Sequence, residues 1–360
     1  MGSVKRTSQR AVRIWLFVCA AFVYAILVVG GVTRLTHSGL SIAEWQPLVG
    51  AVPPLSDHDW AVLFEKYQAT PEYRLVNSGM ALAGFKQIFW WEYAHRLMAR
   101  LAGFVFLLPL LWFAWSGKVS GNLTRRLAIL FVLGGLQGAL GWYMVASGLV
   151  DDPHVSPLRL AGHLGLALLI IGTMLWTAWD LGAADAPRGR VPALACATVA
   201  AVFLMAIAGA LVAGTRAGYA YNTFPLMNGA FVPPGLLQIS PWYLNFRDNI
   251  TTIQFTHRAI AWALIGLVAA LWGWIRRSVP APTARVESNW MLAALVLQIG
   301  LGISTLLSGV ALPLAAAHQA GAVLLFAAVL WTAHALSVQR AVSANLTSRP
   351  FRTARSLLHA

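Results

Sequence analysis

Two similar segments, Glu92-Tyr-Ala-His-Arg96 and Gln254-Phe-Thr-His-Arg258, decide how this chain of 360 residues is organised. The second segment follows the first after 162 residues, and each lies in a long apolar stretch. A histidine and the arginine next to it therefore recur at matched positions in two parts of the sequence. Self-similarity of this kind indicates that the chain contains two related structural units.

The repeat continues on both sides of these two segments. Three more pairs of segments recur in the same order along the chain: Thr33-Arg34 with Thr215-Arg216, Gln137-Gly-Ala-Leu-Gly141 with Gln298-Ile-Gly-Leu-Gly302, and Leu160-Ala-Gly-His163 with Ala315-Ala-Ala-His318. We therefore assign residues 1–186 to the first unit and residues 187–360 to the second.

The composition places both units in a membrane. Hydrophobic residues make up 58% of the chain and charged residues 11%, and the mean hydropathy is +0.67. A soluble domain is about 45–50% apolar and about 25% charged, so this chain has more apolar surface than a soluble fold can bury. Disorder, a coiled coil, a secreted disulfide scaffold and a soluble Rossmann or barrel enzyme are excluded on this ground.

Eight stretches are long enough to cross a hydrocarbon core of about 30 Å as helices. We predict the spans Val12–Val32, Trp90–Ala114, Leu127–Ala146, Leu158–Trp179, Val191–Gly214, Ile253–Ile275, Met291–Val310 and Leu314–Ser337. The predicted fold is an all-α integral membrane protein with eight transmembrane helices in two tandem four-helix bundles. Because each bundle has an even number of spans, both enter the membrane from the same side, which predicts a pseudo-twofold axis along the membrane normal.

The net charge of +14 follows from this topology. The termini and the loops on their side hold 16 Lys and Arg against three acids, whereas the opposite loops hold seven against eight. The positive-inside rule then predicts that both termini are cytoplasmic. The basic character reflects orientation in the lipid bilayer, so nucleic acid is not needed as a partner.

Four histidines recur in the repeat: His95, His163, His257 and His318. Each lies in the first part of a span that runs from outside to inside, so we expect all four near the outer, periplasmic face. Two histidines on facing helices of one bundle are typical of a bis-histidine haem site. One alternative is that each histidine only hydrogen-bonds a neighbouring helix. Zinc is a weaker alternative, because two histidines per bundle make an incomplete tetrahedral site.

The two bundles differ at one position close to a histidine. Glu92 lies one helical turn before His95, where the second bundle has the neutral Gln254. A carboxylate there can reach a ligand of His95 and exchange protons with it, which predicts chemistry in the first bundle and electron transfer in the second. The alternative is an ion pair of Glu92 with Arg96 or Arg100.

Arg34 and Arg216 occupy matched positions after the first span of each bundle. They are candidates to bind haem propionates, and an ordinary contact with lipid headgroups is the alternative.

The segment Gly30-Gly-Val-Thr-Arg-Leu-Thr-His-Ser-Gly-Leu-Ser41, the Glu92–Arg96 motif and the three other histidines together resemble the haem A synthase family over essentially the whole chain. The resemblance implies that His257 and His318 are the axial ligands of a haem b, that His95 and His163 hold the substrate haem O, and that Glu92 is the catalytic acid. It implies oxidation of a methyl group of haem O to the formyl group of haem A by two successive hydroxylations and loss of water, with oxygen derived from water. The product serves cytochrome oxidase assembly.

The resemblance also implies a setting for the protein. The first outer loop contains no cysteine, which matches the cysteine-free branch of proteobacteria and mitochondria and leaves a disulfide step without support. The implied location is the bacterial inner membrane. Expected partners are a haem O synthase and cytochrome oxidase assembly factors. The electron acceptor is open, and so is the oligomeric state, a homo-oligomer included.

Two other functions fit four intramembrane histidines. One is a dihaem, quinol-linked electron carrier, which does not need the difference between Glu92 and Gln254. The other is a proton-coupled transporter without haem.

Overall fold

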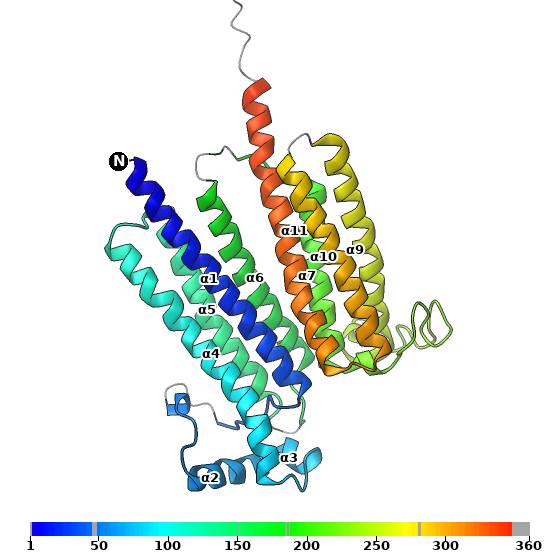
Figure 1. Ribbon diagram of the computed structural model, residues 1–360. Helices are drawn as coiled ribbons and strands as arrows, with labels where there is room; N and C mark the ends of the chain where they lie inside the picture. Colours follow the sequence, from blue (N-terminus) through cyan, green and yellow to red (C-terminus); the bar gives the residue numbers. More distant parts are fainter. Residues whose placement is uncertain are drawn as a thin grey trace, which may run out of the picture.

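The computed structural model describes residues 2–44, 49–150, 152–183, 186, 188–279 and 282–347, so the tail beyond Thr347 lies outside the described residues. Its regular structure in these ranges is helical (Figure 1), and the only β-type pairing there is an isolated bridge between Met227 and Ala230. The all-helical class predicted from the sequence is therefore confirmed for the part of the chain described.

Eight helices in the described ranges are long and apolar enough to cross a membrane, as predicted. They are α1 (Gly2–Leu35), α4 (Leu82–Trp115), α5 (Gly121–Ala146), α6 (Pro157–Gly182), α7 (Ala193–Gly214), α9 (Ile250–Ser278), α10 (Pro282–Leu307) and α11 (Leu312–Thr347).

Several helix ends differ from the prediction, because hydropathy detects the apolar part of a helix and not its continuation. Helix α4 starts at Leu82 rather than at Trp90, and the extra turns carry the buried Phe85 and Phe89. Helix α7 instead begins at Ala193, slightly later than the predicted Val191, because Pro192 occupies its N-cap position.

The spanning helices pack as two groups of four that follow the order of the sequence. Helices α1, α4, α5 and α6 contact one another in the first half, and α7, α9, α10 and α11 do so in the second. The groups lie side by side in Figure 1 and meet where α1 and α6 contact α11, and where α6 contacts α7. The pseudo-twofold axis and the limits of the two domains stay predictions.

The interiors of the two groups are apolar. In the first, Trp15 of α1 packs against Phe106 and Phe113 of α4. In the second, Leu271 of α9 and Phe326 of α11 belong to a larger cluster that also takes in residues of α6 and α7. Since lipid is as apolar as these side chains, close packing rather than exclusion of water holds the helices together.

A cap made of residues 49–75 covers one end of the first group. It contains η1 (Val49–Ala51), α2 (Asp57–Gln68) and α3 (Pro71–Leu75). Trp60 and Tyr67 of α2 pack on Phe85 and Phe89 of the extended α4. Figure 1 shows α2 and α3 at the bottom, whereas the N-terminus and the C-terminal end of α11 lie at the top. The aromatic cluster thus fixes the cap to the end of the protein opposite the termini.

The corresponding segment of the second group, residues 215–249, has less helix. It contains η2 (Ala217–Tyr219), η3 (Trp242–Leu244) and α8 (Asn245–Asp248). Asn245 is fully buried and holds the segment together, because its amide group donates to the carbonyls of Ile239 and Trp242 and accepts from the N–H of Ile239.

We expect Gly214→Ala to lower the free energy of unfolding by about 1–3 kcal/mol, the usual cost of overpacking. A Cβ atom at Gly214 would lie 2.8 Å from the Cα atom of Pro157, so the backbones of α7 and α6 would have to move apart. Thermal unfolding of the purified protein in detergent measures the loss. Gly266→Ala is the matched control, since nothing lies within 4 Å of a Cβ atom there. Equal melting temperatures for the two variants would contradict the close approach of α6 and α7.

Candidate functional site

The four histidines of the repeat lie on four different membrane-spanning helices. His95 is on α4 and His163 on α6, whereas His257 is on α9 and His318 on α11. His163 is close enough to His95 for a charge on one ring to act on the other, and the same holds for His257 and His318. The structure thus brings the histidines together as one pair in each half of the chain.

A glycine of a neighbouring helix faces each histidine ring. At each of these glycines, an added Cβ atom would approach the Cε1 atom of the ring to 3.3 Å or less. The pairs are Gly30 with His95, Gly141 with His163, Gly209 with His257, and Gly302 with His318. Each ring therefore packs directly against the backbone of the adjacent helix, in space that any larger residue would fill.

Three of the four Nδ1 atoms lack a hydrogen-bond partner among the described residues. The Nδ1 atoms of His163, His257 and His318 are buried and have no partner among the described residues, and only the Nδ1 atom of His95 contacts a carbonyl, that of Ile26, at 3.1 Å. Leaving a buried polar atom unpaired costs about 1–3 kcal/mol. The alternative in which each histidine merely hydrogen-bonds another helix therefore does not describe these three residues.

Two glutamines hold the backbone at one histidine of each pair. The Nε2 atom of Gln137 donates to the carbonyl of His163 at 3.0 Å, and that of Gln298 donates to the carbonyl of His318 at 2.9 Å. This contact explains the repeated Gln-x-x-x-Gly motif, because residues four apart share a helix face. The repeat drew attention to the glutamines, but their role was missed from the sequence.

Glu92 is buried and held by three donors. One carboxylate oxygen accepts hydrogen bonds from the hydroxyl of Ser41 at 2.7 Å and from the N–H of Ile42 at 2.8 Å. The other oxygen is paired with the guanidinium of Arg96 one turn further along α4. The ion pair considered from the sequence is thus present, with Arg96 as its partner. Three donors stabilise the ionised carboxylate and fix its position.

The same scaffold surrounds the matched position in the second half, but without the charge. Arg96 donates to the carbonyls of Ile42 and Glu44, and Arg258 donates in the same way to those of Tyr221 and Thr223.

Gln254 takes the place of the carboxylate there. It donates to the carbonyl of Tyr221 at 3.1 Å, and its Oε1 atom is buried without a partner among the described residues. Both sites have an arginine that binds the carbonyls of a loop. They differ because only the first site has a negative charge and the donors that bind it.

Arg34 and Arg216 join the two halves. The Nη1 atom of Arg34 donates to the carbonyl of Ala213 on α7 at 2.9 Å, and Arg216 lies 3.4 Å from the Nδ1 atom of His37 after α1. Burial, together with the charges of Arg216 and Arg34, lowers the pKa of His37, which keeps the ring neutral beside the two cations. Binding of propionates by these arginines stays a prediction.

The described residues contain no group of three or more His, Cys, Asp and Glu side chains that could hold a metal ion by themselves. A closed tetrahedral zinc site needs four such ligands. Both cysteines are free thiols, Cys19 on α1 and Cys196 on α7. The donor set that remains in each half is a pair of imidazoles, which suits an iron ion held in a macrocycle.

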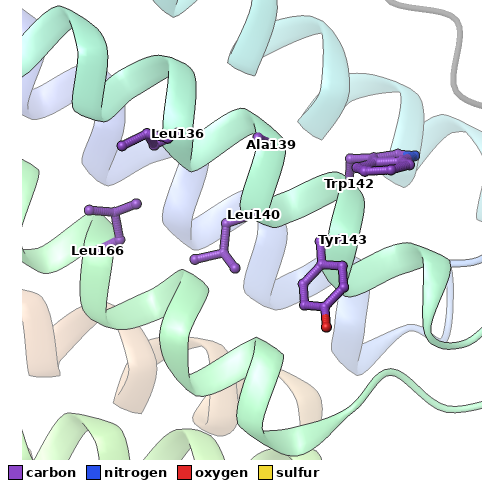
Figure 2. Close-up of a pocket in the computed structure, with 6 residues that line it drawn as sticks. All are labelled: Leu136, Ala139, Leu140, Trp142, Tyr143 and Leu166. Atoms are coloured by element: carbon purple, nitrogen blue, oxygen red, sulfur yellow. The ribbon is translucent and has the colours of Figure 1, made fainter.

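Two cavities lie near the first half. The cavity in Figure 2, of about 450 Å³, is lined by apolar and aromatic side chains of α5 and α6, and most of these are exposed on the bundle surface. Its lining suits a lipid chain. A second cavity, of about 440 Å³, lies between the cap and α4, and Ser41, Ile42 and Arg96 line it. The partners of Glu92 therefore border this second cavity.

Comparison with known proteins gives consistent matches. A family model described as cytochrome oxidase assembly protein matches residues 13–330. A protein of Nitrosospira multiformis named Heme A synthase is 55% identical over 337 residues, which cover 92% of this chain and 95% of that protein. Proteins with the same name from Nitrosomonas eutropha and Parvibaculum lavamentivorans are 48% and 46% identical, over 91% and 94% of this chain and 94% and 98% of their own lengths.

Arg96→Ala should destabilise the protein by about 3–5 kcal/mol, because it leaves the buried charge of Glu92 without its partner. Arg258→Ala is the matched control, since it removes the same carbonyl contacts beside the neutral Gln254 and should cost less. Thermal unfolding in detergent compares the two variants. Adding Glu92→Gln to Arg96→Ala should restore part of the loss. Equal losses in the two arginine variants would show that Glu92 carries no buried charge.

Proposed function

This chain belongs to the COX15-CtaA family of cytochrome oxidase assembly proteins, and we propose that it acts as a haem A synthase that oxidises a methyl group of haem O to the formyl group of haem A. Relatives with that name match it over nearly their full length. The observation that carries the proposal at the level of residues is the contrast between Glu92 and Gln254 on the same scaffold.

In the second half, His257 and His318 would hold a haem b as its axial ligands. The residues fit this group, because both rings have a buried Nδ1 atom without a partner among the described residues and both face a glycine. When bound, haem b supplies one-electron oxidation and reduction. Gln298 orients this site by fixing the backbone at His318. A neutral Gln254 beside the site suits a role in electron transfer, since no proton has to move there.

In the first half, His95 and His163 would hold the substrate haem O. Gly30 and Gly141 leave room against the two rings, and Gln137 fixes the backbone at His163. Glu92, one turn from His95, would place a fixed negative charge beside the substrate. A preorganised charge of this kind stabilises positive charge that develops during oxidation, and its donors keep it from moving during the reaction.

We place the protein in the bacterial inner membrane with both termini in the cytoplasm and the histidines toward the periplasm. The common end of the N-terminus and α11 in Figure 1, and the excess of Lys and Arg near the termini, support this orientation. A haem O synthase and other assembly factors are the partners that the function requires. The electron acceptor and the formation of a homo-oligomer are left to experiment.

Glu92→Gln should lower haem A formation by roughly 10²–10³-fold, the usual loss when one preorganised charge or donor is removed from a reaction centre. Haem O should accumulate instead, because the ligands His95 and His163 are intact. Extraction and chromatography of haems from membranes measures both. Haem A at the level of the unmodified protein would mean that Glu92 is not catalytic.

His257→Ala and His318→Ala should each remove the low-spin b-type signal from the reduced absorption spectrum of the purified protein. The reason is that low-spin haem of this type needs both axial imidazoles. His154→Ala is the control, since His154 lies outside the spans and pairs with Asp152. A normal low-spin spectrum in both variants would overturn this ligand assignment, and no haem signal in the unmodified protein would leave the transporter as the better function.

A further inference from the structure

The cap contains a second buried carboxylate, which the proposed function has not used. Glu72 on α3 is 5% exposed, and its Oε2 atom is buried without a hydrogen-bond partner among the described residues. A charged or polar group in such a place costs free energy, and acids near functional sites commonly serve in proton transfer. In the sequence, Glu72 was counted only among the eight acids of the loops opposite the termini.

The local structure holds Glu72 in place. Thr70 caps the N-terminus of α3 through its side chain, and the carbonyl of Glu72 accepts hydrogen bonds from the N–H groups of Val76 and Asn77. The side chain of Asn77 donates to the hydroxyl of the fully buried Tyr67 at 2.7 Å. The capped helix and the backbone bonds of Glu72 therefore fix its position in the cap.

Three groups from other elements act on Glu72: Tyr67 of α2, Glu92 of α4 and Arg216 after α7. Burial, followed by the negative charge of Glu92, raises the pKa of Glu72 to about 7, against the opposing effects of Tyr67 and Arg216. Glu72 is therefore close to half protonated at neutral pH, and it senses the site of Glu92 electrostatically.

The corresponding cap segment of the second half has no matching group. In residues 215–249, all of which the structure describes, the single acid is Asp248, which is exposed and paired with Arg247 at 2.7 Å. The half that contains Glu92 thus has a buried acid in its cap, and the half that contains Gln254 does not. This distribution matches the division into a reaction site and an electron-transfer site.

The proposed reaction has to release protons. Conversion of a methyl group and one water molecule into a formyl group yields four protons and four electrons, and the electrons pass to a one-electron acceptor in the membrane. Glu92 is poorly suited to carry the protons away, because both of its oxygens are engaged by donors. Glu72 has an oxygen without such a donor.

We propose that Glu72 is a proton-transfer residue, which takes up protons released at the site of Glu92 and passes them to the water outside the cap. Each transfer converts its carboxylate to the carboxylic acid and back, so Glu72 itself is unchanged after every proton. This inference rests on the proposed function. In this proposal Glu92 provides a fixed negative charge beside the substrate, and Glu72 transfers the protons.

The test compares Glu72→Gln with Glu65→Gln, an exposed acid of the same cap, and with Glu44→Gln. Glu44 lines the cavity between the cap and α4, where it pairs with Lys66 at 2.8 Å, so its variant tests that cavity as the other exit for protons. Haem A formation in membranes is measured from about pH 5 to about pH 8 for each variant. Thermal unfolding of the purified proteins over the same range gives a readout that does not depend on activity.

In the unmodified protein the rate should rise with pH through about 7, because Glu72 must be ionised to accept a proton. Stability should fall as the pH rises from about 4.5 to about 7 and should level off above that, because in this interval the unfolded chain has released the proton of Glu72 and the folded protein still holds it. Glu72→Gln should remove the pH dependence of the rate and slow the reaction by roughly tenfold to a hundredfold. It should weaken the pH dependence of stability, and the part that remains comes from other acids such as Glu287, whose Oε2 atom is also buried without a hydrogen-bond partner among the described residues. Glu65→Gln and Glu44→Gln should keep both pH dependences.

Three results would overturn the inference. Glu72→Gln could keep the pH dependence of the rate, which would leave Glu72 with a structural role even if the pH dependence of stability weakens. Stability could be equally pH-dependent in Glu72→Gln and the unmodified protein, so that Glu72 takes up no proton. Glu44→Gln could be the only variant that removes the pH dependence of the rate. Protons would then leave through the cavity between the cap and α4. Absence of haem A from the unmodified protein at every pH would instead count against the proposed function, and the stability measurement would still test Glu72.

Discussion

The buried carboxylate of Glu92 on α4 is the constraint on which the first half of this structure depends. A buried charge without partners costs several kcal/mol, so the surrounding chain has to supply donors. Arg96, Ser41 and the backbone of Ile42 do so, and this brings the segment after α1 onto α4. The same contacts hold the beginning of the loop that leads to the cap.

The second half shows what the scaffold does without that charge. Arg258 binds the loop after α7 as Arg96 binds the loop after α1, but Gln254 needs no set of donors. Both halves keep a pair of histidines packed against glycines. One architecture therefore carries two sites that differ mainly in electrostatics, and this is the arrangement expected when oxidation occurs at one site and electrons leave through the other.

Hydropathy and the internal repeat were enough to predict the eight spans, the histidine pairs and the contrast between Glu92 and Gln254, because these depend on local composition and matched spacing. Contacts between distant residues could not be predicted in this way. Three such features arise only when the helices pack. They are the hydrogen bond from Gln137 to the carbonyl of His163, the hydrogen bond from Arg34 to the second half, and the burial of Glu72 in the cap. The start of α4 differed for the related reason that a helix can continue past its apolar part.

The central claim is that this chain converts haem O to haem A. The most direct measurement is to express it in a bacterial host that makes haem O but lacks haem A, and to identify the extracted haems by mass. Our account predicts that haem A appears and haem O declines. Unchanged haem O, with the protein present in the membrane and loaded with haem b, would contradict the account.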